Sequence, residues 1–422
     1  MSILKNSIWN IAGYAVPTLI AIPAFGYIAR KIGVELFGLY TLSMIVIGYA
    51  SVFDAGLTRA VVREVALLKN NDRDSRSLLL TSALTVLFLG FIGSGLMLAL
   101  KEKIILTLNI SSDYHYDISK SITLLALLMP VFLVTQVFLA DLEGREYFGH
   151  LNIQRSIGNS LIAGIPAIAV HLNHTLFSAI IGITIARLFC LWLSYYYIQN
   201  RITFSRKCIS LVILKRLFSY GGWVTVSNII SPLLVSMDRF ILSSVLGASK
   251  ISFYTVPSEL ITRLSIIPGS VGKTIFPKLS KAEDFSNSWD CQKKAYKLMA
   301  FICFPVCIFL FIFSERILVL WMGPDYYGQP AVILKIMLVG FIFNCFSQIP
   351  FANIQAFGKA KYTAFIHMIE FIPYILLLYY TAKLYGMYGV AVLWMLRVII
   401  DFFMLYSMSS KCNRMMKMMG VK

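Results

Sequence analysis

Long apolar runs alternate with short polar segments along the whole chain. A transmembrane helix needs roughly 20 predominantly apolar residues to cross about 30 Å of hydrocarbon, and about twelve runs approach that length. Prolines, glycines and single charges interrupt several runs, which membrane helices tolerate because neighbouring helices satisfy the freed backbone groups. The pattern predicts an all-α polytopic membrane protein with about 12 transmembrane helices. The runs lie near residues 8–29, 36–57, 77–100, 119–140, 156–172, 175–198, 217–241, 251–276, 296–314, 331–350, 362–382 and 386–407.

The composition agrees with this interpretation and excludes several functions. Of the 422 residues, 58% are hydrophobic and 14% are charged, whereas soluble domains are about half apolar and a quarter charged. The spans leave only short loops and no room for a soluble catalytic or nucleic-acid-binding domain, so the net charge of +18 does not indicate a nucleic-acid partner. The chain has no Walker loop, and we expect no catalytic residue, no metal site and no cofactor.

The positions of the basic residues predict the orientation in the membrane. Lys and Arg concentrate in the cytoplasmic loops of membrane proteins. With the N-terminus inside, the inner loops hold about 25 of the 38 basic residues and the outer loops about 8. We therefore expect both termini in the cytoplasm and an even number of spans.

The two halves of the chain show signs of an internal repeat. A shift of 214 residues aligns landmarks of the first half with landmarks of the second, together with the ends of the apolar runs. Because six spans per half is an even number, the halves enter the membrane with the same orientation and form parallel repeats. We predict an N-terminal six-helix lobe (1–200), a cytoplasmic linker (201–218) and a C-terminal six-helix lobe with a cytoplasmic tail (219–422), with a central cavity between the lobes. The aligned landmarks are Trp9 with Trp223, Gly33 with Gly247, Tyr40 with Tyr254, Thr41 with Thr255, Arg59 with Lys273, and Gly144 with Gly358.

Charged residues in or beside the apolar runs are the main candidates for function. A charge at the centre of a membrane costs about 2.5–3.5 kcal/mol on insertion scales, so it needs a partner, water or a functional reason. Guanidinium groups bind phosphate through a bidentate fork and stay charged in any environment. The arginines therefore suit an anionic head group, whereas the acids are candidates for cation coupling. The arginines are Arg30, Arg59, Arg63, Arg187, Arg239, Arg263 and Arg397, and the acids are Asp238, Glu259, Glu370 and Asp401, with His367 nearby.

Helical spacing places four of these charges in two pairs. Glu259 lies four residues before Arg263, and Arg397 lies four residues before Asp401, so each pair shares one helix face. Either pair can serve mutual neutralisation during insertion or a functional role, and the sequence leaves both interpretations open.

Five arginines remain outside these pairs. Arg30, Arg187 and Arg239 have no acidic residue three or four positions away, which favours a binding role. Arg59 and Arg63 share a helix face at the inner end of the second run, where ordinary positive-inside anchoring is an alternative to substrate binding.

Three segments resemble a known family of membrane transporters. The run WNIAGYAVPTLIAIPAFGYIARKIGVELFGLYTL (Trp9–Leu42), the segment FDAGLTRAVVREVA (Phe53–Ala66) and the stretch MDRFILSSVLG (Met237–Gly247) occur here in that order. They resemble the polysaccharide-biosynthesis flippases, the O-antigen translocase (repeat-unit flippase) branch of the multidrug/oligosaccharidyl-lipid/polysaccharide exporter superfamily. The resemblance covers nearly the whole chain.

The resemblance implies two six-helix lobes around a V-shaped cavity in the bacterial cytoplasmic (inner) membrane. It implies that undecaprenyl pyrophosphate bearing an oligosaccharide repeat unit moves from the cytoplasmic to the periplasmic leaflet by alternating access. Polymerase and chain-length proteins of the same pathway are the implied protein partners, besides membrane lipid. The family's charged positions fall here on Arg30, Arg59, Arg63, Asp238 and Arg239.

Two other functions compete with a flippase. A cation-coupled drug antiporter of the same superfamily would favour a cavity rich in acids and poor in arginine. A membrane-bound glycosyltransferase or polymerase acting on the same lipid would need a large outer loop with catalytic residues. The longest outer loop is short and contains only Asp113 and Asp117 as plausible catalytic acids.

The orientation is directly testable with reporter fusions. Enzymes that are active only outside the cytoplasm, fused after Asn109 and after His174, should both be active because both positions fall in predicted outer loops. Fusions after Lys69 serve as the inactive control. A cytoplasmic result at either outer position would reject the orientation.

Overall fold

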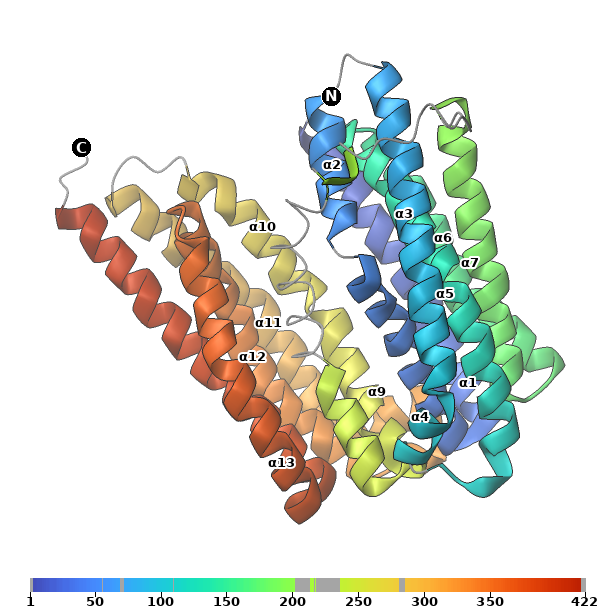
Figure 1. Cartoon of the computed structure of the whole chain (residues 1–422). Helices are drawn as coiled ribbons and strands as arrows, with labels where there is room; N and C mark the ends of the chain where they lie inside the picture. The colour runs from blue at the N-terminus through green and yellow to red at the C-terminus, as the bar shows by residue number, and fades with distance from the viewer. Residues whose placement is uncertain are drawn as a thin grey trace. The chain divides into compact units, whose positions relative to one another are not determined.

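The fold is entirely helical wherever the structure describes it. The computed structural model describes residues 3–54, 56–68, 72–108, 110–201, 213–215, 217, 236–280 and 285–418. Figure 1 shows these residues as bundles of long helices. Seven helical segments among them are long and apolar enough to span a membrane, and two of the seven each contain a backbone break that separates two helices. The all-α polytopic membrane fold is therefore confirmed.

The first of two compact units comprises residues 1–236 and 247–249. In it α1 packs against α6, α3 against α5, and α7 against both α5 and α6. Buried Leu and Val side chains of α2, α3 and α5 form a common core. The helices are α1 (Ile3–Tyr49), α2 (Leu57–Leu67), α3 (Asp72–Ala99), α4 (Lys101–Thr107), α5 (His115–Gly144), α6 (Phe148–Leu172) and α7 (Leu176–Ile198), with 3-10 turns at Ala50–Asp54, Ser112–Tyr114 and Gln199–Arg201.

The second unit comprises residues 237–246 and 250–422. Here α12 is the central helix, because it packs against α10, α11 and α13. Residues 236–246 are helical. The later helices are α9 (Ala248–Leu264), α10 (Ile266–Ser280), α11 (Phe285–Met322), α12 (Gln329–Ala356) and α13 (Ala360–Met418), with a 3-10 turn at Pro324–Tyr326.

Glycines with positive φ divide the chain into membrane helices without intervening loops. Gly33 inside α1 has φ 81° and ψ 172°, and Gly386 inside α13 has φ 61° and ψ −146°. This left-handed half of the backbone map is open to glycine at little cost. Each glycine therefore ends one helix and lets the next begin at once, so the 47 residues of α1 and the 59 residues of α13 each form two helices.

The segment after the second apolar run differs from the sequence prediction. The run was expected to remain helical to residue 57, but α1 ends at Tyr49 and a 3-10 turn follows. Asp54 accepts hydrogen bonds from the backbone N of Thr58 (3.1 Å) and from its hydroxyl (2.8 Å). Gly56, with φ 68°, precedes α2. The hydrogen bonds of Asp54 with Thr58 and the positive φ of Gly56 separate α1 from α2, which is a short amphipathic helix. This is the structural role of Asp54, Gly56 and Thr58 in the segment FDAGLT.

The positions of the helices support the internal repeat. Under the shift of 214 residues, the start of α5 at His115 falls on the start of α12 at Gln329. Gly33 and Gly247, which are equivalent under the same shift, have φ 81° and 84°. Tyr40 and Tyr254 are both fully buried. The predicted seventh run (217–241) and the predicted linker (201–218) lie mostly outside the described residues, so the lobe boundaries and the superposition of the lobes stay predictions.

Close helix crossings in the first unit depend on glycine. A Cβ atom added to Gly182 on α7 would lie 2.6 Å from Cα of Pro166 on α6. A backbone neighbour at this distance cannot move aside as a flexible side chain can, so only glycine permits the observed approach.

Substitution of Gly182 should destabilise this crossing. We expect Gly182→Leu to lower the free energy of unfolding by about 1–3 kcal/mol because the added side chain overpacks the contact with Pro166. Thermal unfolding of the purified protein in detergent measures the effect. Gly95→Leu on α3 is the matched control, since a Cβ at the exposed Gly95 meets nothing within 4 Å. Equal unfolding temperatures for the two variants would contradict the prediction.

Candidate functional site

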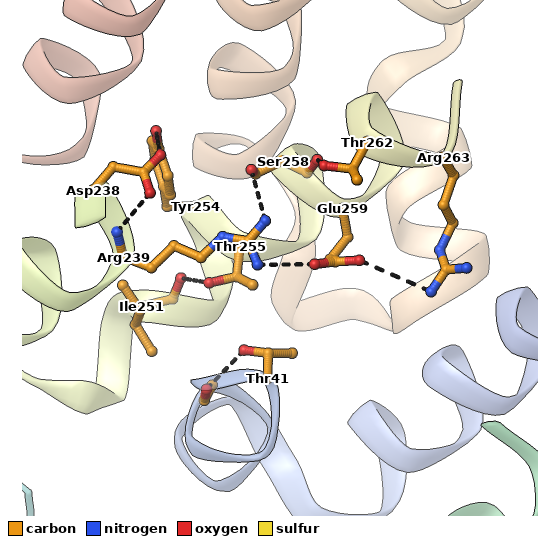
Figure 2. A network of polar contacts seen from close by, with 11 residues as sticks. Thr41, Asp238, Arg239, Ile251, Tyr254, Thr255, Ser258, Glu259, Thr262 and Arg263 are labelled. Atoms are coloured by element: carbon orange, nitrogen blue, oxygen red, sulfur yellow. Dashed lines mark hydrogen bonds and ion pairs between the residues drawn. The ribbon is translucent and has the colours of Figure 1, made fainter. Parts of the chain in front are cut away.

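A network of charged side chains connects helix 236–246 with α9 in the second unit (Figure 2). Asp238 is 2% exposed. Its Oδ2 accepts a 2.6 Å hydrogen bond from the hydroxyl of Tyr254, and its Oδ1 accepts a 2.8 Å bond from the backbone N of Arg239. Burial of a carboxylate is costly unless hydrogen bonds compensate it. The two donors therefore hold Asp238 in place between the two helices.

Arg239 is buried and has an acidic partner. Its Nη1 donates to Oε1 of Glu259 at 2.8 Å, and its Nη2 donates to the hydroxyl of Ser258 at 3.0 Å. The sequence prediction that Arg239 lacks an acidic partner is wrong. Spacing along one helix reports only partners on that helix, whereas Glu259 reaches Arg239 from α9.

Glu259 joins two arginines. Its Oε2 lies 3.8 Å from Nη2 of Arg263, four residues later on α9, so the predicted Glu259–Arg263 pair is present. Its other oxygen binds Arg239 at the shorter distance of 2.8 Å. Figure 2 shows the carboxylate between the two guanidinium groups. One carboxylate thus contacts two guanidinium groups, while Asp238 lies on the other side of Arg239.

A second cluster of charges lies on α13, on both sides of the Gly386 break. The ligand atoms of His367, Glu370 and Asp401 all lie within 4.8 Å of one another. Nδ1 of His367 is 3.6 Å from Oδ1 of Asp401, which is longer than a hydrogen bond. The guanidinium carbon of Arg397 lies 4.9 Å from the centre of the Tyr374 ring. The sequence indicated Glu370 and Asp401 as candidates for cation coupling, with His367 nearby, but not that the three meet, because the two halves of the cluster are more than thirty residues apart in the chain.

The remaining candidate arginines belong to the first unit. Arg187 on α7 lies 4.7 Å from the centre of the Phe132 ring and has no acidic partner among the residues that the structure describes. Arg30 on α1 and Arg59 and Arg63 on α2 are exposed, and Nη1 of Arg63 is 3.4 Å from Glu64. Of the seven candidate arginines, Arg239 and Arg263 meet at one carboxylate, that of Glu259. Convergence of the others on one cavity stays a prediction.

Sequence reasoning overlooked the polar roles of two residues in the network of Asp238, Arg239 and Glu259. Ser258 accepts a hydrogen bond from Arg239, and Tyr254 donates one to Asp238. The alignment of Tyr40 with Tyr254 marked Tyr254 as a repeat landmark but gave no sign of its polar role. No periodic pattern distinguishes Ser258 from other serines in membrane helices.

The arrangement around Glu259 leads to a stability prediction. Glu259→Gln removes the carboxylate beside Arg239, whose side chain is 5% exposed. Removing one partner of a buried ion pair costs about 3–5 kcal/mol, and the partial exposure of Glu259 places the expected loss at the lower end of this range. The double variant Glu259→Gln/Arg239→Met removes the stranded charge and should recover much of the loss. Thermal unfolding in detergent compares the two, and a double variant no more stable than the single one would contradict this role.

Comparison with known proteins places the chain in a family. The model of the family described as polysaccharide biosynthesis protein matches residues 3–283. A protein of Shigella flexneri named "Putative O-antigen transporter" is 45% identical over 401 residues, which cover 95% of this chain and 96% of the relative. The Bacillus subtilis membrane protein EpsK is 22% identical over 371 residues, which cover 80% of this chain and 71% of EpsK.

Solved structures share the fold. An inward-facing multidrug resistance MATE family transporter of the MOP superfamily superposes with a TM-score of 0.78 over 100% of this chain and 97% of that one, at 14% identity. A MOP superfamily transporter from Pyrococcus furiosus, whose binding pocket is described as having reverse polarity, gives a TM-score of 0.69 over 98% and 96%, at 15% identity. At these identities the likeness concerns the fold, which in these transporters consists of two six-helix lobes. Together with the family match over most of the sequence, these findings show that the chain belongs to the polysaccharide biosynthesis protein family.

Proposed function

We propose that this protein is a flippase that moves an undecaprenyl-pyrophosphate-linked oligosaccharide, an O-antigen or similar repeat unit, from the cytoplasmic to the periplasmic leaflet by alternating access. The observation that carries the proposal is the 45% identity to the Shigella flexneri relative over 95% of the chain. The aligned region covers nearly the whole chain, so the two proteins correspond along all of the transport path and not in one segment alone.

The arginines supply the chemistry for the pyrophosphate. Arg263 is one-fifth exposed, and its contact with Glu259 is longer than a hydrogen bond. A pyrophosphate oxygen offers a guanidinium group a closer bidentate partner than this carboxylate does. Arg239, held by Glu259 and Ser258, then acts as a positioning residue that fixes the carboxylate beside Arg263. Arg30, Arg59, Arg63, Arg187 and Arg397 are proposed to contact the head group at other stages of its passage.

The membrane potential favours export of this anionic substrate. Moving one elementary charge across 100 mV is worth about 2.3 kcal/mol, so two negative charges leaving a negative interior gain roughly 4–5 kcal/mol. The isoprenoid tail can stay in lipid throughout, because only the polar head group needs a hydrated path. Polymerase and chain-length proteins that act on the delivered repeat unit are the proposed partners. The proposal places the chain in the inner membrane of a bacterium with both termini in the cytoplasm.

The fold likeness to multidrug transporters does not favour drug export. At 14% identity it concerns the arrangement of helices and not the ligand. In the described part of the chain, Glu259 and Asp238 are engaged by arginine, tyrosine and backbone donors, so two of the four candidate acids are already neutralised by the protein.

Substitution of Arg263 tests the proposed head-group contact. Arg263→Ala should reduce surface polysaccharide in a strain lacking its own flippase by about 10-fold or more, as expected for loss of a charge-assisted bidentate contact. Arg263→Lys keeps the charge without the fork and should retain part of the activity, whereas Arg263→Glu should be the least active because it repels the anion.

The control lies on the same helix. Lys250→Ala removes an exposed basic residue of α9 and should leave export unchanged. Protein abundance in the same membranes is measured for each variant. Normal export by Arg263→Glu at normal abundance would show that Arg263 does not bind the substrate.

A further inference from the structure

A cluster of His367, Glu370 and Asp401 on α13 lies outside the hydrogen-bonded network of Asp238, Arg239 and Glu259. Its three ligand atoms lie within 4.8 Å of one another, and α12 packs against the helix that carries them. The ring of Phe351 on α12 lies 6.2 Å from the ring of His367. The cluster therefore lies in a mostly apolar part of the helix bundle.

The carboxylates in this cluster differ from those of the Asp238–Glu259 network in what they contact. Glu370 is 8% exposed, yet its Oε1 has no hydrogen-bond partner in the described part of the chain, and neither has Oδ1 of Asp401. Buried polar atoms are normally paired, and each exception requires an explanation such as a bound ion or proton. Two neighbouring carboxyl groups that each have an oxygen without a hydrogen-bond partner point to a positively charged ligand between them.

Counting the neighbouring charges indicates how much positive charge this ligand carries. Arg397 lies close enough to interact electrostatically with His367, Glu370 and Asp401, and also with Asp238. The ring of Tyr374, on the first of the two helices of α13, lies 4.9 Å from the guanidinium carbon of Arg397 on the second. With both carboxylates ionised and His367 neutral, one arginine leaves the cluster with one uncompensated negative charge, and Arg397 is shared with Asp238. A ligand with a single positive charge therefore balances the cluster.

The chemistry of the three side chains selects among such ligands. Sodium prefers oxygen ligands, as other hard cations do, and an imidazole nitrogen is a poor partner for it. A zinc-like divalent ion suits imidazole and carboxylate, but together with Arg397 it would leave an uncompensated positive charge in an apolar bundle. Two adjacent carboxyl groups commonly share one proton, because both cannot ionise at close range. An imidazole beside them can accept and pass on that proton.

We propose that His367, Glu370 and Asp401 form a proton-binding site on α13, in which one proton is shared by the two carboxyl groups and exchanges through His367. Asp401 lies beyond the Gly386 break from His367 and Glu370, so the proton links the two helices of α13. Coupling of this proton to export of the lipid-linked oligosaccharide rests on the proposed function, whereas the binding of the proton does not.

Infrared difference spectroscopy of the purified full-length protein tests the site without any substrate. Spectra recorded between neutral and alkaline buffer should show the loss of a protonated carboxyl band equivalent to about one proton per chain. Glu370→Gln and Asp401→Asn should each remove this band, and His367→Gln should change the pH at which it disappears. Asp290→Asn, at a carboxylate whose side chain is 61% exposed, is the matched control and should leave the band unchanged.

Two further measurements keep the test decisive. The double variant Glu370→Gln/Asp401→Asn imitates the neutral state of both side chains and should unfold at the wild-type temperature or above, which shows that loss of the band is not loss of the fold. Thermal unfolding is also followed with added Na⁺ or Zn²⁺. A band that persists in both single variants overturns the proposal, and so does stabilisation of the wild type, but not of the double variant, by either metal ion.

These outcomes separate the two proposals. A missing band in the wild type rejects the proton site and leaves the flippase assignment untouched. A normal band in a protein that fails to export polysaccharide rejects the flippase and leaves the proton site in place.

Discussion

The cost of a charge inside hydrocarbon governs the polar structure of this protein. An isolated charge at the membrane centre is expensive, so the charged residues in the apolar runs must find partners in the fold. Arg239, the most deeply buried of the arginines in the network, is fixed by Glu259 and Ser258. Asp238 is fixed by Tyr254 and a backbone N–H. Where a buried carboxylate oxygen has no hydrogen-bond partner in the described part of the chain, as at Glu370, a ligand can complete the site.

A second constraint acts on the backbone conformation. The chain must turn between membrane helices without exposing unpaired backbone N–H and C=O groups to lipid. Glycines with positive φ meet this need at Gly33, Gly247 and Gly386, where one helix ends and the next begins. Close crossings such as that of Gly182 with Pro166 bring helix backbones together. The resulting packing gives the charged side chains fixed positions, which a site with two guanidinium groups on one carboxylate requires.

The predicted internal repeat relates helix positions but not charges. Under the shift of 214 residues, Asp238, Glu259 and Glu370 fall on Ala24, Ile45 and Ser156. Asp401 falls on Arg187, so an acid in one half corresponds to a base in the other. The two halves thus use one scaffold for different electrostatic purposes. The proposed proton site and the Asp238–Glu259 network are confined to the second half, whereas the intramembrane arginine without an acidic partner in the described residues lies in the first.

The sequence by itself determined the fold class and which charged residues lie in or beside apolar segments, because hydrophobic length and the cost of buried charge act locally along the chain. It also predicted the Glu259–Arg263 pair, since both residues lie on one helix. Only the tertiary structure decided that Arg239 shares Glu259 and that His367 and Glu370 meet Asp401. Those contacts join different helices, and helical spacing carries no information about which faces of two helices pack together. The end of α1 at Tyr49 was likewise decided by a local turn with Asp54 bonded to Thr58, which an apolar run does not reveal.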